Sequence, residues 1–209
     1  MARPKGRHRG PFAKTAGILA VATVLFVATI HGFLGVTRPT GTGILMVEAW
    51  IPCQSLQGAV DAFRSGSYSY MVVVGTQGSS YDHMPNYSDR AVEVLEKMGQ
   101  DKNRIVKVVS PHVVVHRTFT EARAFRDWTI SSGAAACCVD VYTTGVHARK
   151  SWITVQSVLG NSYRVGVIAG PEQSYNPRYW FLSRRGIWLV LRNLSGYLYT
   201  KYEIAIGHA

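Results

Sequence analysis

The spacing of apolar residues along the chain predicts strands that alternate with helices. Nearly continuous apolar runs predict strands over residues 44–47, 70–74, 104–109, 138–143 and 163–169. Helical spacing between them predicts helices over 54–64, 88–98, 118–130 and 146–159. Strands of this kind are typical of a parallel sheet covered on both faces. With right-handed crossovers, this predicts an α/β fold, a Rossmann-like doubly wound domain with a mainly parallel five-stranded sheet.

An apolar segment precedes this domain. Residues 16–36 carry no formal charge with His31 neutral, and their length is close to the roughly 20 residues that cross a bilayer as a helix. Basic residues gather before the segment and only Arg38 follows closely, which places the N-terminus in the cytoplasm. A cleavable signal peptide is the alternative, but its apolar core is usually shorter and no small-x-small site is seen near residues 32–36.

We therefore expect four parts in the chain. They are a basic cytoplasmic arm over residues 1–15, a transmembrane helix over 16–36, a linker over 37–43 and a Rossmann-like extracytoplasmic domain over 44–209. The expected protein crosses the plasma membrane once.

The formal charge of +11 belongs largely to the N-terminal part. Residues 39–209 carry 17 basic and 12 acidic residues, a net charge of +5, without a basic stripe interleaved with aromatic residues. Nucleic acid is therefore not expected as a partner, whereas anionic lipid headgroups or phosphorylated substrates are compatible with this charge.

Cysteine and histidine spacing gives no metal site or disulfide framework. Cys137 and Cys138 would form a disulfide only through a strained ring, because neighbours in a strand point to opposite faces. Cys53, Cys137 and Cys138 are therefore expected to be small buried residues. His112 and His116 flank an extended Val run and would lie about 13 Å apart, too far to share one ion. No Gly-x-Gly-x-x-Gly, Walker or Gly-x-Ser-x-Gly motif follows a predicted strand, and no cofactor is assigned.

The strongest candidate site is the turn after the fourth predicted strand. Thr144 and Gly145 end the strand, and His147, Arg149 and Lys150 open the next helix. Ligands of open α/β sheets bind at this edge, and a helix start attracts anions. We expect an anionic ligand here, with His147 as a proton-transfer or oxyanion-contacting group; a hydrogen-bonded structural histidine is the alternative. One of Arg149 and Lys150 is expected to face the site.

Two other strand ends should meet the same edge. Glu48 ends the first strand, where it is expected to act as a general base, to orient His147, or to pair with a nearby arginine. Gly75 and Thr76 open a Gly- and Ser-rich segment over 75–80 that would either cradle an anion or form a plain loop. Thr118 and Glu121 have the spacing of a capping box at a helix start.

The C-terminal tail is rich in aromatic residues. A final helix is expected over 187–198, packed on the sheet. Core packing is the favoured interpretation of these aromatic residues, and contact with a membrane surface through Arg184, Arg185 and Arg192 is the alternative.

Several of these segments resemble one known family. Val47-Glu-Ala-Trp-Ile-Pro52, Gly75, Arg117-Thr118 with Glu121, and Thr143-Thr-Gly-Val-His147-Ala-Arg-Lys-Ser151 resemble the SanA, YdcF and ElyC group of bacterial proteins. The likeness runs over about residues 44–199 and is strongest at the His147 segment. The chain departs from the group at Ala49, where relatives often have Gly, at Lys150, where they often have Arg, and at Arg192 and Asn193, where a Glu is common.

The resemblance implies a fold, a location and a role. It implies a Rossmann-like fold, one N-terminal span in a bacterial plasma membrane, and a role in cell-envelope biogenesis or barrier integrity that involves a lipid-linked or phosphorylated envelope precursor. It marks six positions as family motif residues, namely Glu48, Gly75, Arg90, Thr118, His147 and Lys150. Because lysine lacks the bidentate fork of arginine, the ligand geometry is expected to differ at Lys150.

Two functions follow as hypotheses. The first is a membrane-anchored domain that binds an anionic, phosphorylated envelope precursor beside His147. The second is a non-catalytic envelope scaffold, or a protein that binds a nucleotide-like ligand without enzyme activity.

Overall fold

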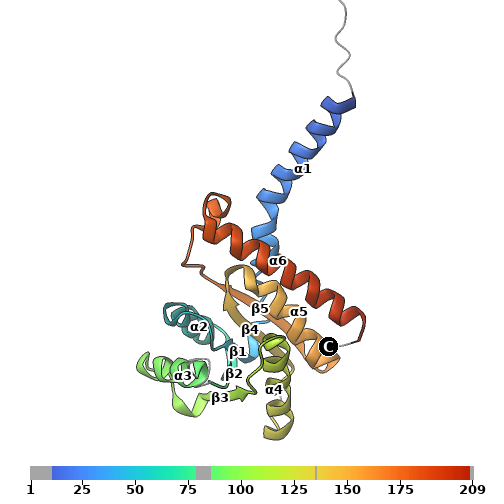
Figure 1. Ribbon diagram of the computed structural model, residues 1–209. Coiled ribbons are helices and arrows are strands. Elements are labelled where there is room, and N and C mark those ends of the chain that lie inside the picture. Colours follow the sequence, from blue (N-terminus) through green and yellow to red (C-terminus); the bar gives the residue numbers. More distant parts are fainter. Residues whose placement is uncertain (1–10, 79–85, 135, 208–209) are drawn as a thin grey trace, which may run out of the picture.

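A parallel five-stranded sheet forms the centre of the domain, as expected (Figure 1). The computed structural model describes residues 11–78, 86–134 and 136–207. The strand order is β3-β2-β1-β4-β5, so the winding direction changes between β1 and β4. The strands are β1 (Thr42–Glu48), β2 (Ser67–Thr76), β3 (Ile105–Ser110), β4 (Cys138–Thr144) and β5 (Arg164–Gly170).

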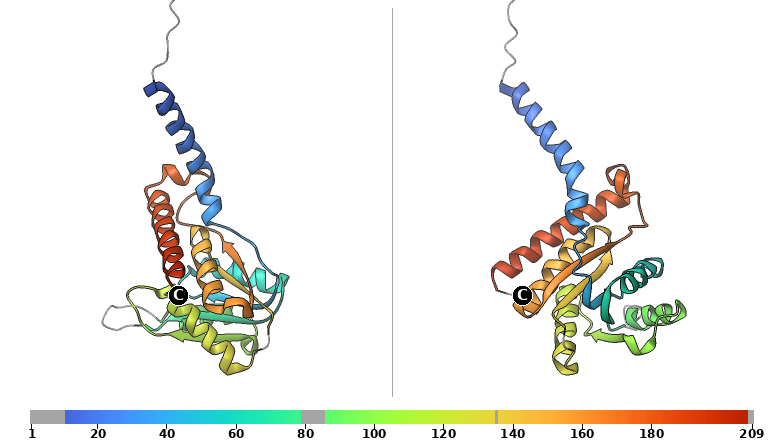
Figure 2. Two further views of the ribbon diagram at one scale, coloured as in Figure 1. Left: turned by 90° about the vertical axis from the view of Figure 1, so that its right-hand side faces the viewer. Right: turned by 180° about the vertical axis from the view of Figure 1, so that it is seen from behind.

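Helices cover both faces of this sheet (Figures 1 and 2). Along β1, Leu45 and Val47 pack against α2 (Cys53–Ser65) and α3 (Tyr87–Lys97). Ile44 and Met46 point to the other side, in the core with α4 (Arg117–Ser132) and α5 (Ala148–Leu159). Short 3-10 segments, η1 (Lys102–Arg104) and η3 (Gly160–Ser162), precede β3 and β5. Strand side chains alternate between the faces, so a central strand is apolar at almost every position.

The segment before β1 is fixed to the sheet rather than free. Arg38 and Val167 exchange backbone hydrogen bonds of 2.7 and 3.1 Å, which adds a short antiparallel bridge beside β5. The backbone N–H groups of Thr40 and Gly41 donate to the buried carboxylate of Asp140. The linker expected over residues 37–43 is therefore part of the folded domain, and β1 begins at Thr42.

The final helix is longer and lies further out than expected. α6 spans Arg184–Ala205 and contacts α5, α1, η2 (Gly145–His147) and η4 (Pro177–Leu182), so it lies outside α5 and not on the sheet. The expectation that the aromatic tail packs into the core was wrong for most of its members. Trp180 and Tyr175 are buried, whereas Trp188, Tyr199 and Tyr202 are at least half exposed.

One long apolar helix, α1 (Pro11–Leu34), projects away from the domain (Figure 1). The segment Lys14–Leu34 is long and apolar enough to cross a membrane, judged by length and composition alone. A signal sequence near the N-terminus would meet the same criteria. The last turns of α1 pack against the domain. Ile30 and Leu34 join a buried cluster with Val146, and the Trp180 indole donates to the carbonyl of Val27 at 3.2 Å.

The three cysteines do not share one environment. Cys138 is buried as expected, whereas Cys53 is half-buried and Cys137 is exposed, so the expected burial was wrong for Cys137. All three are free thiols. Cys137 precedes β4 and therefore lies outside the covered part of the sheet.

Candidate functional site

A cleft of about 800 Å³ opens at the carboxyl end of the sheet, beside the change of winding direction between β1 and β4. Its walls come from the turn between β1 and α2, the start of α4, the end of β4 with η2 and α5, and one side of α6. This volume is typical of a pocket for a small molecule. The fold therefore places a ligand-sized space where open α/β sheets bind their ligands.

Glu48 lies fully buried behind this cleft. Its carboxylate accepts hydrogen bonds from the hydroxyls of Ser151, at 2.6 Å, and of Thr143. The indole of Trp50 donates to Oε2 at 3.1 Å. No Arg side chain pairs with Glu48 in the described part of the chain, so the arginine alternative does not apply. Three donors hold the side chain of Glu48 in place, and Glu48 does not itself line the cleft.

His147 connects this carboxylate with the cleft. Gly145 has a φ of +47°, a left-handed conformation that suits glycine, and the tight turn there brings His147 to the wall. Nδ1 of His147 lies 2.8 Å from Oδ1 of Asn193. Because Nδ2 of Asn193 donates to the carbonyl of Leu189, Oδ1 is the acceptor and Nδ1 carries the proton.

The second ring nitrogen of His147 is left without a partner. Nε2 is buried and has no hydrogen-bond partner among the described residues, and it lies 3.8 Å from Oε2 of Glu48. Burial lowers the pKa of His147 to about 4, and the positive charge of Lys150 adds to this effect. The ring is therefore neutral at pH 7, and Nε2 is the nitrogen without a proton.

Glu121 is a second buried carboxyl group of the cleft wall. The expected capping box is absent, because α4 starts without a side-chain cap and Glu121 instead accepts a hydrogen bond of 3.1 Å from Thr76. Burial raises the pKa of Glu121 to about 8, and the negative charge of Glu48 adds to the shift. At neutral pH Glu121 is largely protonated, so it adds little negative charge to the cleft.

Four cationic side chains line the cleft: Arg117, Lys150, Arg185 and Arg192. Within the described ranges, none of the four forms an ion pair with a carboxylate. Burial lowers the pKa of Lys150, which reports a largely desolvated ammonium group. Gly196 of α6 makes room for this side chain, since a Cβ there would lie 3.3 Å from Cδ of Lys150. The cleft thus carries more positive than negative charge.

Five of the residues chosen from the sequence lie in or directly at this cleft. Thr76, Thr118, Thr144, His147 and Lys150 all line it. Of the two cations after His147, Lys150 is the one that faces the cleft.

The other predicted residues lie elsewhere. Arg149 donates to the carbonyl of Phe33 and stacks its guanidinium 3.9 Å from the Phe33 ring, so it holds the end of α1. Gly75 packs against Ala49, and Gly145 against Glu172. Arg90 is exposed on α3 and does not line the cleft. Part of the predicted 75–80 segment, Ser79 and Ser80, lies outside the described residues.

Sequence reasoning missed the contribution of α6. Asn193, Arg192 and Gly196 belong to a helix that was expected on the sheet, and their role depends on how α6 crosses α5. Glu121 was interpreted from the sequence only as part of a capping box, so its place in the cleft wall was missed as well. Ser55 was also missed, and its buried hydroxyl has no partner among the described residues and lines the cleft.

No group of three or more His, Cys, Asp or Glu side chains is placed to hold a metal ion within residues 11–78, 86–134 and 136–207. His116 lies at the cleft with a left-handed φ of 59°, rare for a residue with a side chain. Its ring packs beside Tyr199, with ring centroids 5.7 Å apart. Comparison of the chain with known protein families and with curated proteins gave no match.

Proposed function

We propose that this protein is anchored in a bacterial plasma membrane by α1 and binds an anionic, phosphorylated ligand in the extracytoplasmic cleft at the carboxyl end of the sheet. The observation that carries the proposal is that four cations, without ion-pair partners among the described residues, line the same cleft as His147. Charged donors facing a cleft are suited to phosphate oxygens, which accept several hydrogen bonds at once.

His147 is the group through which the cleft would do chemistry. Nε2 of His147 is buried, so this step requires that the atom become exposed to the cleft when the ligand binds. A hydroxyl of the ligand, or a bound water, would then give its proton to Nε2, so that an O–H bond breaks and an N–H bond forms. The resulting imidazolium lies beside Glu48, whose Oε2 is 3.8 Å from Nε2. Glu48 would thereby stabilise the charged ring without touching the ligand. Returning the proton restores the neutral ring.

The packing of α1 supports an anchor that stays on the protein. Ile30 and Leu34 are buried in a cluster with Val146, Trp180 and Val190. Removal of α1 as a signal sequence would expose this cluster to water, which is unfavourable for apolar side chains. Retention of α1 is therefore part of the proposal.

A role in envelope biogenesis or barrier integrity is proposed from the resemblance to the SanA, YdcF and ElyC group. A lipid-linked or phosphorylated envelope precursor is the ligand class that this role suggests, and such a ligand carries the phosphate groups for which the cleft charge is suited. The alternative is a non-catalytic scaffold with the same anchor. Its supporting observation is that Glu48 is fully occupied by hydrogen bonds inside the fold.

The test is a calorimetric titration of the full-length protein in detergent micelles with inorganic pyrophosphate. Lys150→Met should weaken binding about tenfold to a hundredfold, because a charged hydrogen bond contributes about 1.5–3 kcal/mol. Arg90→Met removes an equal charge from the exposed surface of α3 and should leave the affinity within about twofold of the unmodified protein. Equal affinities of Lys150→Met and Arg90→Met, or no binding by the unmodified protein, would contradict the proposal.

A further inference from the structure

The last part of the chain has an unusual charge distribution. Between Gln173 and Tyr202 there is no Asp or Glu, while five cations occur: Arg178, Arg184, Arg185, Arg192 and Lys201. This segment forms η4 and most of α6. A one-signed surface of this kind attracts anions and repels cations.

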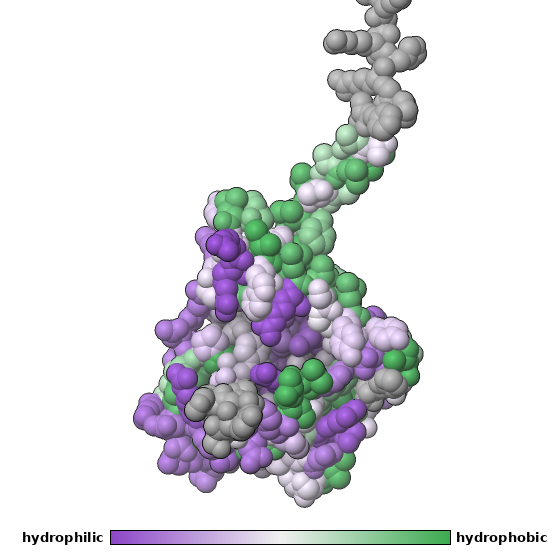
Figure 3. All heavy atoms as spheres, viewed as in Figure 1, coloured by the Kyte–Doolittle hydropathy of each residue, from purple (hydrophilic) through white to green (hydrophobic). Residues whose placement is uncertain are grey.

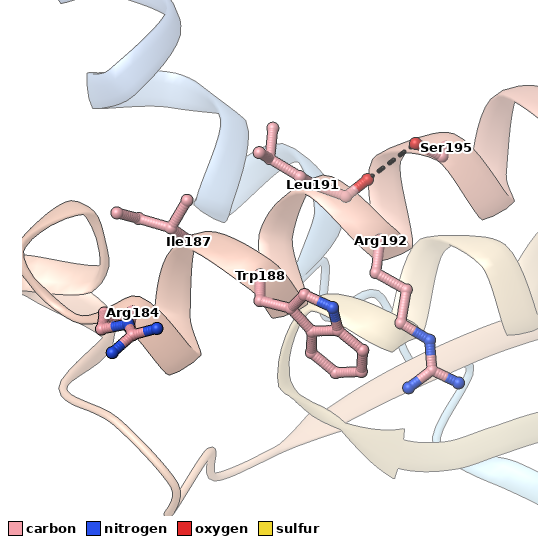
Figure 4. A pocket seen from close by; sticks show the side chains of 6 residues that line it. All are labelled: Arg184, Ile187, Trp188, Leu191, Arg192 and Ser195. Atoms are coloured by element: carbon pink, nitrogen blue, oxygen red, sulfur yellow. Dashed lines mark hydrogen bonds between the residues drawn. The ribbon is translucent and has the colours of Figure 1, made fainter.

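Apolar side chains are exposed among these cations. We call Phe181, Leu182, Ile187, Trp188 and Leu191 the tail face; all five are exposed, Leu182 at 75% and Trp188 at 50% of their surface. They come from η4 and the first half of α6, and Figure 4 shows the α6 members with the neighbouring arginines. A contiguous exposed group of large apolar residues marks an interaction surface.

The arginines pack directly on this apolar surface. The guanidinium of Arg192 lies 4.8 Å and that of Arg185 5.4 Å from the ring centre of Trp188. Figure 4 shows Trp188 and Arg192 extending from the same side of α6. Tryptophan beside arginine is the pair found at the boundary between lipid tails and headgroups, where the ring is partly buried and the cation meets lipid phosphate.

The length of α1 brings this surface to the bilayer. The Trp180 indole bonds to the carbonyl of Val27, and the residues before it, from Lys14 to Phe26, cover about 20 Å at about 1.5 Å per residue, against a hydrocarbon core of about 30 Å. A full crossing therefore needs the turns from Val27 onward, which are the turns that pack against η4 and α6. Figures 2 and 3 show η4 and the start of α6 next to this part of α1, with hydrophobic atoms gathered there.

We propose that the tail face rests on the anionic headgroups of the membrane that α1 crosses. This inference depends on the proposed anchoring by α1. Arg192 lines both this surface and the cleft, and Arg185 lines the cleft while its guanidinium lies over Trp188. Docking therefore places the cleft mouth beside the headgroups. A ligand attached to a lipid then reaches the cleft beside His147 without leaving the membrane. The phosphorylated ligand of the proposed function would therefore be one whose phosphate is attached to a lipid.

The experiment measures how bromine in lipid acyl chains quenches tryptophan fluorescence. The full-length protein is placed in vesicles of phosphatidylcholine and phosphatidylglycerol, with bromine near the headgroup end of the chains. Trp188→Phe should lose the largest single share of the quenching. Trp128→Phe, which changes a half-buried residue of α4, should keep all of it. Replacing phosphatidylglycerol by phosphatidylcholine should reduce the quenching of Trp188.

Three results would overturn the inference. Unchanged quenching in Trp188→Phe means that the tail face is away from the lipid. Equal quenching of Trp188 in both lipid mixtures removes the anionic headgroup as partner. Protection of Trp188 in a cross-linked dimer assigns the face to a second copy of the chain. When one of these results occurs and Lys150-dependent pyrophosphate binding in micelles persists, the docking surface alone is wrong and the proposed cleft stands. If the protein washes off the vesicles, the proposed anchoring has failed.

Discussion

At the scale of single residues, burial determines the protonation states of the titratable side chains at the cleft. Three donors hold the carboxyl group of Glu48, Glu121 is largely protonated, and His147 is neutral with one nitrogen unpaired among the described residues. Different environments thus give neighbouring titratable groups different protonation states, an arrangement that is common in sites that move protons.

Replacing His147 distinguishes catalysis from scaffolding. His147→Gln removes the proton acceptor but keeps a polar side chain of similar length beside Asn193, so the melting temperature should change by only a few degrees. Envelope barrier function in cells should be lost, and pyrophosphate binding should remain within about tenfold.

The matched control is His112→Gln, because His112 does not line the cleft. Full cellular function of His147→Gln would support the scaffold alternative instead. Measurements of cellular barrier function and of melting temperature on both variants decide the question.

Residue identity was predictable from the sequence where one short segment carries the information. The strand-turn-helix segment at Gly145 was sufficient to select His147 and the neighbouring pair Arg149 and Lys150. Successive helix residues point about 100° apart, so only one of Arg149 and Lys150 was able to face the cleft. Which one could not be deduced, because it depends on where Phe33 of α1 lies.

At the scale of elements, one buried carboxylate holds three segments together. Asp140 of β4 accepts hydrogen bonds from the backbone of Thr40 and Gly41 and from the hydroxyl of Tyr68, at 2.6 Å. These partners lie just before β1 and at the start of β2, so they are at the amino-terminal edge of the sheet, opposite the edge that carries the cleft. Asp140 therefore fixes the segment that joins α1 to the sheet.

Asp140→Ala should destabilise the protein. It leaves two backbone N–H groups and a hydroxyl without partners, which should cost about 3 kcal/mol or more. The melting temperature of the full-length protein should fall by roughly 6–12 °C, while pyrophosphate affinity in the folded protein stays the same. Asp127→Asn, at an exposed position of α4, should melt like the unmodified protein. Equal melting of Asp140→Ala and Asp127→Asn would contradict this role.

Element types were predictable, whereas the place of the outer elements was not. The apolar strands and the helices between them follow from local periodicity, and the structure has them in the expected order. α6 was misplaced because its apolar residues suit either a core or a lipid surface. The first turns of the domain were taken for a linker because Thr-Gly-Thr-Gly has no apolar pattern, although its backbone binds Asp140.

At the scale of the whole molecule, the cleft depends on the strand order. The change of winding direction between β1 and β4 brings Glu48 and His147 together across 99 positions of the chain. α6 then closes the cleft from outside and presents Asn193 to His147. Local periodicity predicts that Glu48 and His147 lie at the same edge of the sheet. It does not predict how α6 crosses α5, so the contact of Asn193 with His147 could not be predicted.

The central claim is that a neutral His147 lies in the wall of a cleft that binds an anion. Its most direct test is nuclear magnetic resonance of the full-length protein with ¹⁵N-labelled histidine in micelles, with His147→Gln to assign the signal. We predict a proton on Nδ1 at pH 7 and a titration midpoint at a pKa of about 4. Bound pyrophosphate should raise this pKa, because an anion stabilises the imidazolium. A midpoint near pH 6.5 that saturating pyrophosphate does not move would contradict the account.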